Sequence, residues 1–194
     1  MRVKRTSFRL ILIGLLIIAL GLWGGFYTIT NNDVKDMEVV NAYINRSLVP
    51  LYLQPIVLVL LYSQILPFRR IRLFVGVRRQ TEQMVMKLMG LAIVYCCIFV
   101  VGLCVPYLLT GWPLFRNGSP IVGSGIILLH IGVFLFLAWL LVGAYNIPHP
   151  YLLLFAVIIL SLLYNFYVEE KLLIFYSPLY DPLYRAIHKI YGGY

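Results

Sequence analysis

The first candidates for chemistry in this 194-residue sequence are the few ionisable side chains inside or beside its apolar runs. His130 stands within one apolar run, and two adjacent carboxylates, Glu169 and Glu170, follow another. An enzyme inside a membrane needs several polar groups held together in a wet cavity. No Asp, Glu or second His lies at membrane depth in the other runs. We therefore expect His130 to hydrogen-bond a carbonyl or hydroxyl of a facing helix, with a polar transport-path lining as the alternative.

The two glutamates are similar to the paired glutamates of intramembrane CAAX-type proteases. Those families follow the pair with an arginine on the same helical face, whereas Lys171, Leu172 and Leu173 follow here. We therefore expect Glu169 and Glu170 to end a membrane span. The sequence has no GxxxxGK[ST] phosphate loop, and its histidines and cysteines form no metal-ligand pattern. The chain is predicted not to be an enzyme, not to hydrolyse ATP by itself, and to need no cofactor or metal.

The composition indicates which elements hold these groups in place. Of the residues, 62% are hydrophobic and 12% are charged, against about 45–50% apolar and about 25% charged in a soluble domain. The apolar residues fall in blocks near the roughly 17–25 residues that cross a bilayer. The predicted fold class is all-α, a polytopic membrane helical bundle in a single transmembrane domain over residues 1–194. Its predicted spans are residues 10–30, 48–66, 84–110, 121–142 and 151–168.

Glycine and proline mark special positions within these spans. The Gly21-xxx-Gly25 spacing can let a neighbouring helix approach closely, or it can be a flexible helix end. Pro55 lies inside the second span and is expected to kink it. Beside it, Gln54 is expected to bond a carbonyl that the kink frees, with the lining of a polar pathway as the alternative.

Charge sets the predicted orientation. The net charge is +9, and the Lys and Arg residues gather in short loops, where their excess marks the cytoplasmic side of a membrane. Residues 1–9 and 67–87 hold ten cations, while the acidic loop 31–47 and the loop 111–120 together hold three. We expect an integral protein of a bacterial plasma membrane, with the N-terminus cytoplasmic and the C-terminus outside. The turn at 143–150 has no cation, although this topology places it inside. Anionic lipid explains the basic loops better than nucleic acid does.

Two further helices are predicted outside the spans. The cytoplasmic loop 67–83 has apolar residues at helical spacing, which indicates a basic connector helix that lies in the headgroup layer or docks onto a cytoplasmic subunit. In the tail, Asp181 and Pro182 are typical of a helix start. The pattern beyond them predicts a short amphipathic helix over residues 182–191.

The layout resembles the small membrane subunits of type-2 ABC exporters, particularly the permeases of Gram-positive bacteriocin or peptide export and immunity systems. The shared features are a basic N-terminus, an acidic outer loop, a long basic loop after the second span, and an aromatic stretch after the fifth, Phe175-Tyr-Ser-Pro-Leu-Tyr-Asp-Pro. In that family the segment after the fifth span re-enters the membrane, and a sixth span follows. Here only 26 residues follow Val168, and none of their runs reaches membrane length.

The resemblance implies a permease that couples to a separate cytoplasmic ATPase through the 67–87 loop and exports a peptide or other amphipathic cargo. A second copy or a paralogue would complete the conduit. The alternative is a non-catalytic accessory or scaffold subunit of a larger membrane complex, which the scarcity of polar groups at depth favours. On the first hypothesis Gln54 and His130 could line the pathway. The residues expected to contact the ATPase, or otherwise lipid headgroups, are Arg69, Arg70, Arg72, Arg78, Arg79 and Glu82.

Overall fold

The computed structural model describes residues 2–30, 48–69, 72, 81–111 and 120–173, and the regular structure within these ranges is all helical. Two of the long helices are composite, because a π-helical segment continues directly into or out of an α-helix. The elements are α1 (Arg2–Thr30), η1 (Leu48–Leu53), α3 (Gln54–Arg69), α5 (Thr81–Thr110), α6 (Pro120–Val142), η2 (Gly143–Tyr145), α7 (Pro150–Leu163) and η3 (Tyr164–Leu173).

Within the described residues, five helices are long and apolar enough to cross a membrane, and the helical class predicted from the sequence is confirmed. The second span continues through Pro67 to Arg69, beyond the predicted end at residue 66, and the third begins earlier, at Thr81. The candidate spans are Phe8–Thr30, Leu48–Arg69, Thr81–Thr110, Gly123–Tyr145 and Pro150–Glu169.

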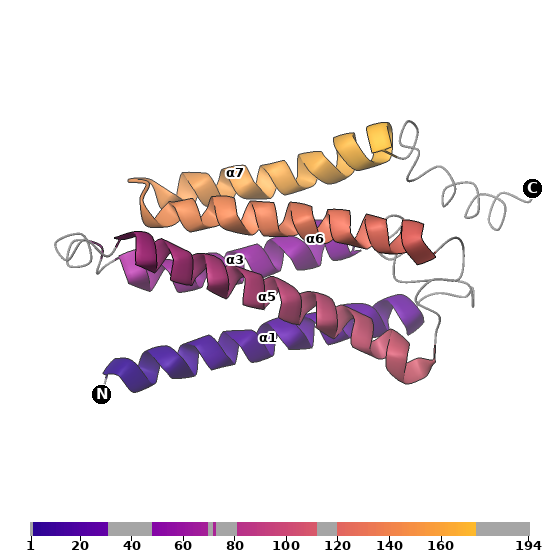
Figure 1. The fold of residues 1–194 in the computed structure, drawn as a ribbon, viewed down its shortest axis with the longest axis horizontal. Coiled ribbons are helices and arrows are strands. Elements are labelled where there is room, and N and C mark those ends of the chain that lie inside the picture. Colours follow the sequence, from indigo (N-terminus) through magenta and orange to yellow (C-terminus); the bar gives the residue numbers. More distant parts are fainter. Residues whose placement is uncertain (1, 31–47, 70–71, 73–80, 112–119, 174–194) are drawn as a thin grey trace, which may run out of the picture.

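The helices run alternately up and down along one axis, so their ends gather in two sets (Figure 1). The start of α1, the end of α3, the start of α5 and the α6–α7 turn lie at one end, which we call the basic end. The opposite end holds the end of α1, η1, the end of α5, the start of α6, and η3. This is the alternation that a five-span chain requires.

Helices α1 and α5 approach one another closely through glycine. A Cβ at Gly21 would lie 2.6 Å from the backbone oxygen of Phe99, and one at Gly25 would lie 2.5 Å from that of Leu103. Both distances are shorter than real Cβ contacts, so the two helices touch because the side chains are missing. The structure therefore decides between the two readings of the Gly21-xxx-Gly25 spacing in favour of close helix packing.

Helices α3, α6 and α7 pack against one another within the same apolar core that contains residues of α1 and α5. Leu58 and Leu61 of α3 and Leu137 and Leu141 of α6 are buried in it. Helix α5 packs on α6 through Phe99 and Phe134, whose ring centroids are 5.8 Å apart at an interplanar angle of 69°, and Arg9 of α1 donates to the carbonyl of Ser63 in α3 over 3.0 Å. Aromatic rings favour this edge-to-face arrangement because their edges and faces carry opposite partial charge.

Arginines bind the basic end together. Arg69 Nη2 donates to the carbonyl of Pro148 over 2.5 Å, and Arg72 Nη1 donates to that of Asn146 over 2.7 Å. The turn that carries no cation of its own is thus bound by cations of the connector. These contacts give a reason for α3 to pass Pro67, since the chain beyond the proline is held by tertiary bonds. Most of the predicted connector helix and the predicted tail helix 182–191 lie outside the described residues.

Candidate functional site

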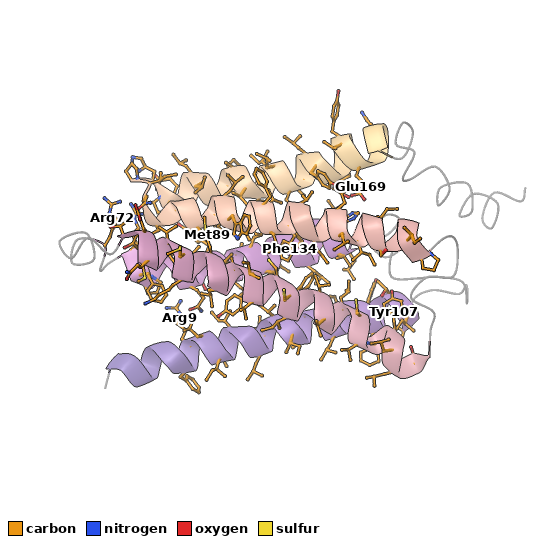
Figure 2. All side chains as sticks on the ribbon, in the orientation of Figure 1. Arg9, Arg72, Met89, Tyr107, Phe134 and Glu169 are labelled. Carbon is orange, nitrogen blue, oxygen red and sulfur yellow. The ribbon has the colours of Figure 1, made fainter. Side chains whose placement is uncertain are left out.

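A small polar pocket lies at the end of the bundle opposite the basic end, between α3, α6 and α7. Glu169 points inward from η3 there, whereas Arg9 and Arg72 lie at the basic end (Figure 2). The pocket takes residues from both π-helical segments, and π-helical turns are frequent at functional sites. Its lining residues are Pro50, Gln54, His130, Val133, Ser161, Tyr164, Asn165 and Glu169.

The α7–η3 side of the pocket is built from a polar stripe in an otherwise apolar run. Ser161, Asn165 and Glu169 follow one another at four-residue intervals, so a helix keeps them on one face. All three are buried, with Glu169 only 1% exposed. The stripe is visible in the sequence and was the signal that could have identified this wall of the pocket.

The α3 side of the pocket is shaped by proline. Pro55 is the second residue of α3, where the π-helical segment η1 ends. A proline has no backbone N–H to donate to the preceding turn. A change from π-helix to α-helix at this point therefore breaks no hydrogen bond from that residue. Pro55, where a kink is expected, thus lies at the change from η1 to α3, next to Gln54 on the pocket wall.

The side chains of His130 and Glu169 lie in close contact across the pocket. The Nε2 atom of His130 lies 2.6 Å from Oε1 of Glu169, and the two side chains are 5% and 1% exposed. On the other side of the ring, Nδ1 lies 2.9 Å from the backbone oxygen of Ile126, and the edge of the ring meets Tyr164. The expectation that His130 has no acidic companion is therefore wrong.

The fifth candidate span ends at Glu169, as expected from the sequence. The helix itself continues as η3 to Leu173, and the side chain of Glu169 is buried beside α6. A carboxylate just after an apolar run can turn into the protein as readily as toward the headgroups, and a buried charge needs such a partner.

Gln54 also has a different partner from the expected one. Its Nε2 donates to the hydroxyl oxygen of Ser161 over 3.3 Å, which links α3 to α7 instead of bonding a carbonyl freed by Pro55. Gln54 and His130, the two polar residues predicted at depth, line the same pocket. The bond to Ser161 links α7 to α3, and the contact between Glu169 and His130 links η3 to α6.

The pocket is too small to hold a peptide or a lipid. The space open to the centre of a water molecule is about 10 Å³, which is roughly what one ordered water occupies. Its described lining contains one carboxylate, one imidazole and one phenol, with no Lys or Arg. Within the described residues there is also no group of three or more His, Cys, Asp or Glu that could hold a metal ion. The chemistry that this pocket can offer is hydrogen bonding and the exchange of a proton.

The predicted docking residues are only partly brought together. Arg69 and Arg72 contact the 143–150 turn, and Glu82 is an exposed residue in the first turn of α5. Arg70, Arg78 and Arg79 lie outside the described residues.

Comparisons were made with protein-family models, with curated proteins and with solved structures. None of them matches this chain. A function for the protein therefore rests on its sequence and its geometry.

Proposed function

We propose that this protein is the membrane-spanning subunit of an ABC-type exporter. On this proposal it docks onto a separate cytoplasmic ATPase through the basic connector and moves a peptide or another amphipathic cargo. The observation that supports it best is the pair of hydrogen bonds that Arg69 and Arg72 donate to backbone carbonyls of the 143–150 turn. Through these bonds Arg69 and Arg72 are joined to the α6–α7 turn at the basic end.

Hydrogen bonds of this kind can transmit a movement of a bound partner to the helices. A displacement of the connector would move the end of α3 and, through the two arginines, the α6–α7 turn. At the far end the same three helices are tied again by the Gln54–Ser161 hydrogen bond and the His130–Glu169 pair. Helices α3, α6 and α7 are therefore linked at both ends, and α5 packs against α6, so a displacement at the basic end would be transmitted through the whole bundle.

The conduit would lie between subunits. The pocket within one chain has room for about one water, so a cargo must pass elsewhere. Helix α7 offers a surface for this, since Leu152, Phe155 and Leu163 are among its exposed apolar side chains. Such a face suits lipid, an amphipathic cargo or a second copy of the chain, whose partner surface would then border the path.

Copurification in mild detergent tests the docking step. Reversing charge with Arg78→Glu and Arg79→Glu should remove an ATPase subunit that copurifies with the unaltered chain, because the connector would then repel an acidic docking groove. Lys171→Glu, an exposed residue near the opposite end, is the matched control and should retain it. Unchanged recovery of the ATPase with the two arginines reversed would contradict the proposal.

A second candidate is an accessory or scaffold subunit of a larger membrane complex, and the small size of the pocket favours it. The two roles differ in what the assembled complex does. If the chain is a permease, photo-crosslinkable cargo should attach to its α7 face during ATP turnover. If it is a scaffold, the complex should assemble through it while cargo crosslinks only to other subunits.

A further inference from the structure

We propose that Arg9 is the centre of a binding site for one anionic phospholipid at the basic end. The Arg9 guanidinium holds the lipid phosphate, and the acyl chains lie along the exposed apolar faces of α1 and α3 below it. This inference goes beyond the proposed export role and does not rest on it, because it needs neither an ATPase nor a cargo.

The site begins with a proline near the end of α3. Pro67 lies inside this helix and has no backbone N–H. The carbonyl of Ser63, four residues earlier, therefore lacks its usual α-helical donor. Arg9 of α1 supplies one instead, because its Nη2 atom donates to the Ser63 oxygen over 3.0 Å. The guanidinium is thus held between two helices, whereas an arginine at the end of a membrane span usually extends freely toward the headgroups.

Arg9 keeps most of its hydrogen-bond donors for a ligand. A guanidinium has five N–H donors in a planar fork, and the bond to Ser63 uses one nitrogen atom of that fork. Within the described part of the chain Arg9 forms no ion pair with a carboxylate, and the residue is exposed. Figure 2 shows its side chain pointing from α1 toward the neighbouring helices. Phosphate oxygens match such a fork, and hydrogen bonds between two charged groups are among the strongest in proteins.

Exposed apolar side chains lie below Arg9 on both helices. Leu12 and Leu16 follow Arg9 by three and seven residues, so they share its face of α1, and they are 51% and 45% exposed. On α3, Val59 precedes Ser63 by four residues and is 42% exposed. Helix α1 begins at the basic end and α3 ends there, so all three apolar residues lie farther from that end than the guanidinium does.

A cation above apolar faces matches the structure of a phospholipid, which carries its anionic headgroup above apolar chains. Basic sites between membrane helices are typical binding places for anionic headgroups. Arg69 and Lys87 add positive charge at the same end, while Glu82 is the one acidic residue among the described residues there. Free phosphate offers the charge without the chains and would leave the apolar faces unused.

Native mass spectrometry of the full chain in mild detergent tests the site, with phosphatidylglycerol as the probe. Arg9→Gln removes the charge and the guanidinium fork. The dissociation constant of the first lipid bound should therefore rise by about tenfold or more, the effect of losing a hydrogen bond between charged groups. Lys87→Gln is the matched control, because it removes an equal charge from an exposed residue at the same end. It should raise the constant by about threefold at most.

Three results would overturn the inference. Equal losses in the two variants would show that binding follows the total charge and not Arg9. Displacement of the lipid by inorganic phosphate would show that the apolar faces take no part. Should Arg9→Gln fail to fold, the unaltered chain decides. A phosphatidylglycerol with a photoreactive group at the top of its acyl chain should crosslink mainly to Leu12, Leu16 and Val59, and crosslinks spread evenly over the five spans would contradict the site.

Discussion

The contact between α1 and α5 yields the sharpest prediction, because the structure places backbone where a new side chain would go. In Gly21→Ala the added Cβ would lie 2.6 Å from the oxygen of Phe99 and 3.0 Å from the nitrogen of Leu103. Neither atom can rotate away as a side chain could. The helices must move apart by about 0.8 Å to restore an ordinary contact near 3.4 Å.

That movement has a cost that can be estimated. Overpacking of a well-packed interface costs about 1–3 kcal/mol, while replacing glycine with alanine in a helix returns about 1 kcal/mol. The movement would also strain the bond across the same interface between Thr28 Oγ1 and the hydroxyl of Tyr107, now 2.8 Å long. An increase of about 0.8 Å would take it beyond hydrogen-bonding distance.

Gly14→Ala is the matched control. It lies on the same helix, receives the same helix-propensity gain, and its Cβ would meet only a ring carbon of Tyr95 at 3.9 Å. The difference between the two variants therefore isolates the steric term, and Gly21→Ala should be less stable than Gly14→Ala by about 1–3 kcal/mol. Reversible unfolding in mixed detergent micelles measures this. Equal stabilities would refute the close approach of the two helices.

Two further predictions concern the polar pocket. His130→Leu alone should lower the free energy of unfolding by about 3–5 kcal/mol because it removes the imidazole that lies against the buried carboxylate of Glu169, whereas His130→Leu with Glu169→Leu should recover most of that loss; a double variant no more stable than the single one would contradict the pairing. Gln54→Leu and Ser161→Ala should couple by about 0.6 kcal/mol in a double-mutant cycle, while Gln54→Leu and Ser124→Ala should be additive, since Ser124 bonds Ile121 of its own helix; zero coupling in the first cycle would argue against the bond between α3 and α7.

Some of the site was within reach of sequence reasoning. Gln54 and His130 were singled out as rare polar residues in apolar runs, and both line the pocket. The sequence analysis does not consider Ser161 or Asn165 and treats Glu169 only as the end of a span, although the four-residue spacing of the three predicts a shared helical face. Residue spacing does not show which side chain of another helix each polar residue contacts. That depends on how each helix is rotated about its axis and how far it is shifted along its neighbour.

The sequence by itself determined that the described chain folds as five long apolar helices, since run length and side-chain polarity decide which segments can cross a bilayer. The sequence also contains the two glycines at which α1 packs against α5. They can be recognised in the sequence because glycine has no side chain whatever surrounds it. Tertiary structure alone decided that Glu169 turns in to meet His130, that Gln54 reaches Ser161, and that Arg69 and Arg72 hold a turn without cations. These side-chain contacts are determined by the packing of whole helices. Many apolar contacts fix how each helix is rotated about its axis, and the buried polar side chains then hydrogen-bond one another between the helices.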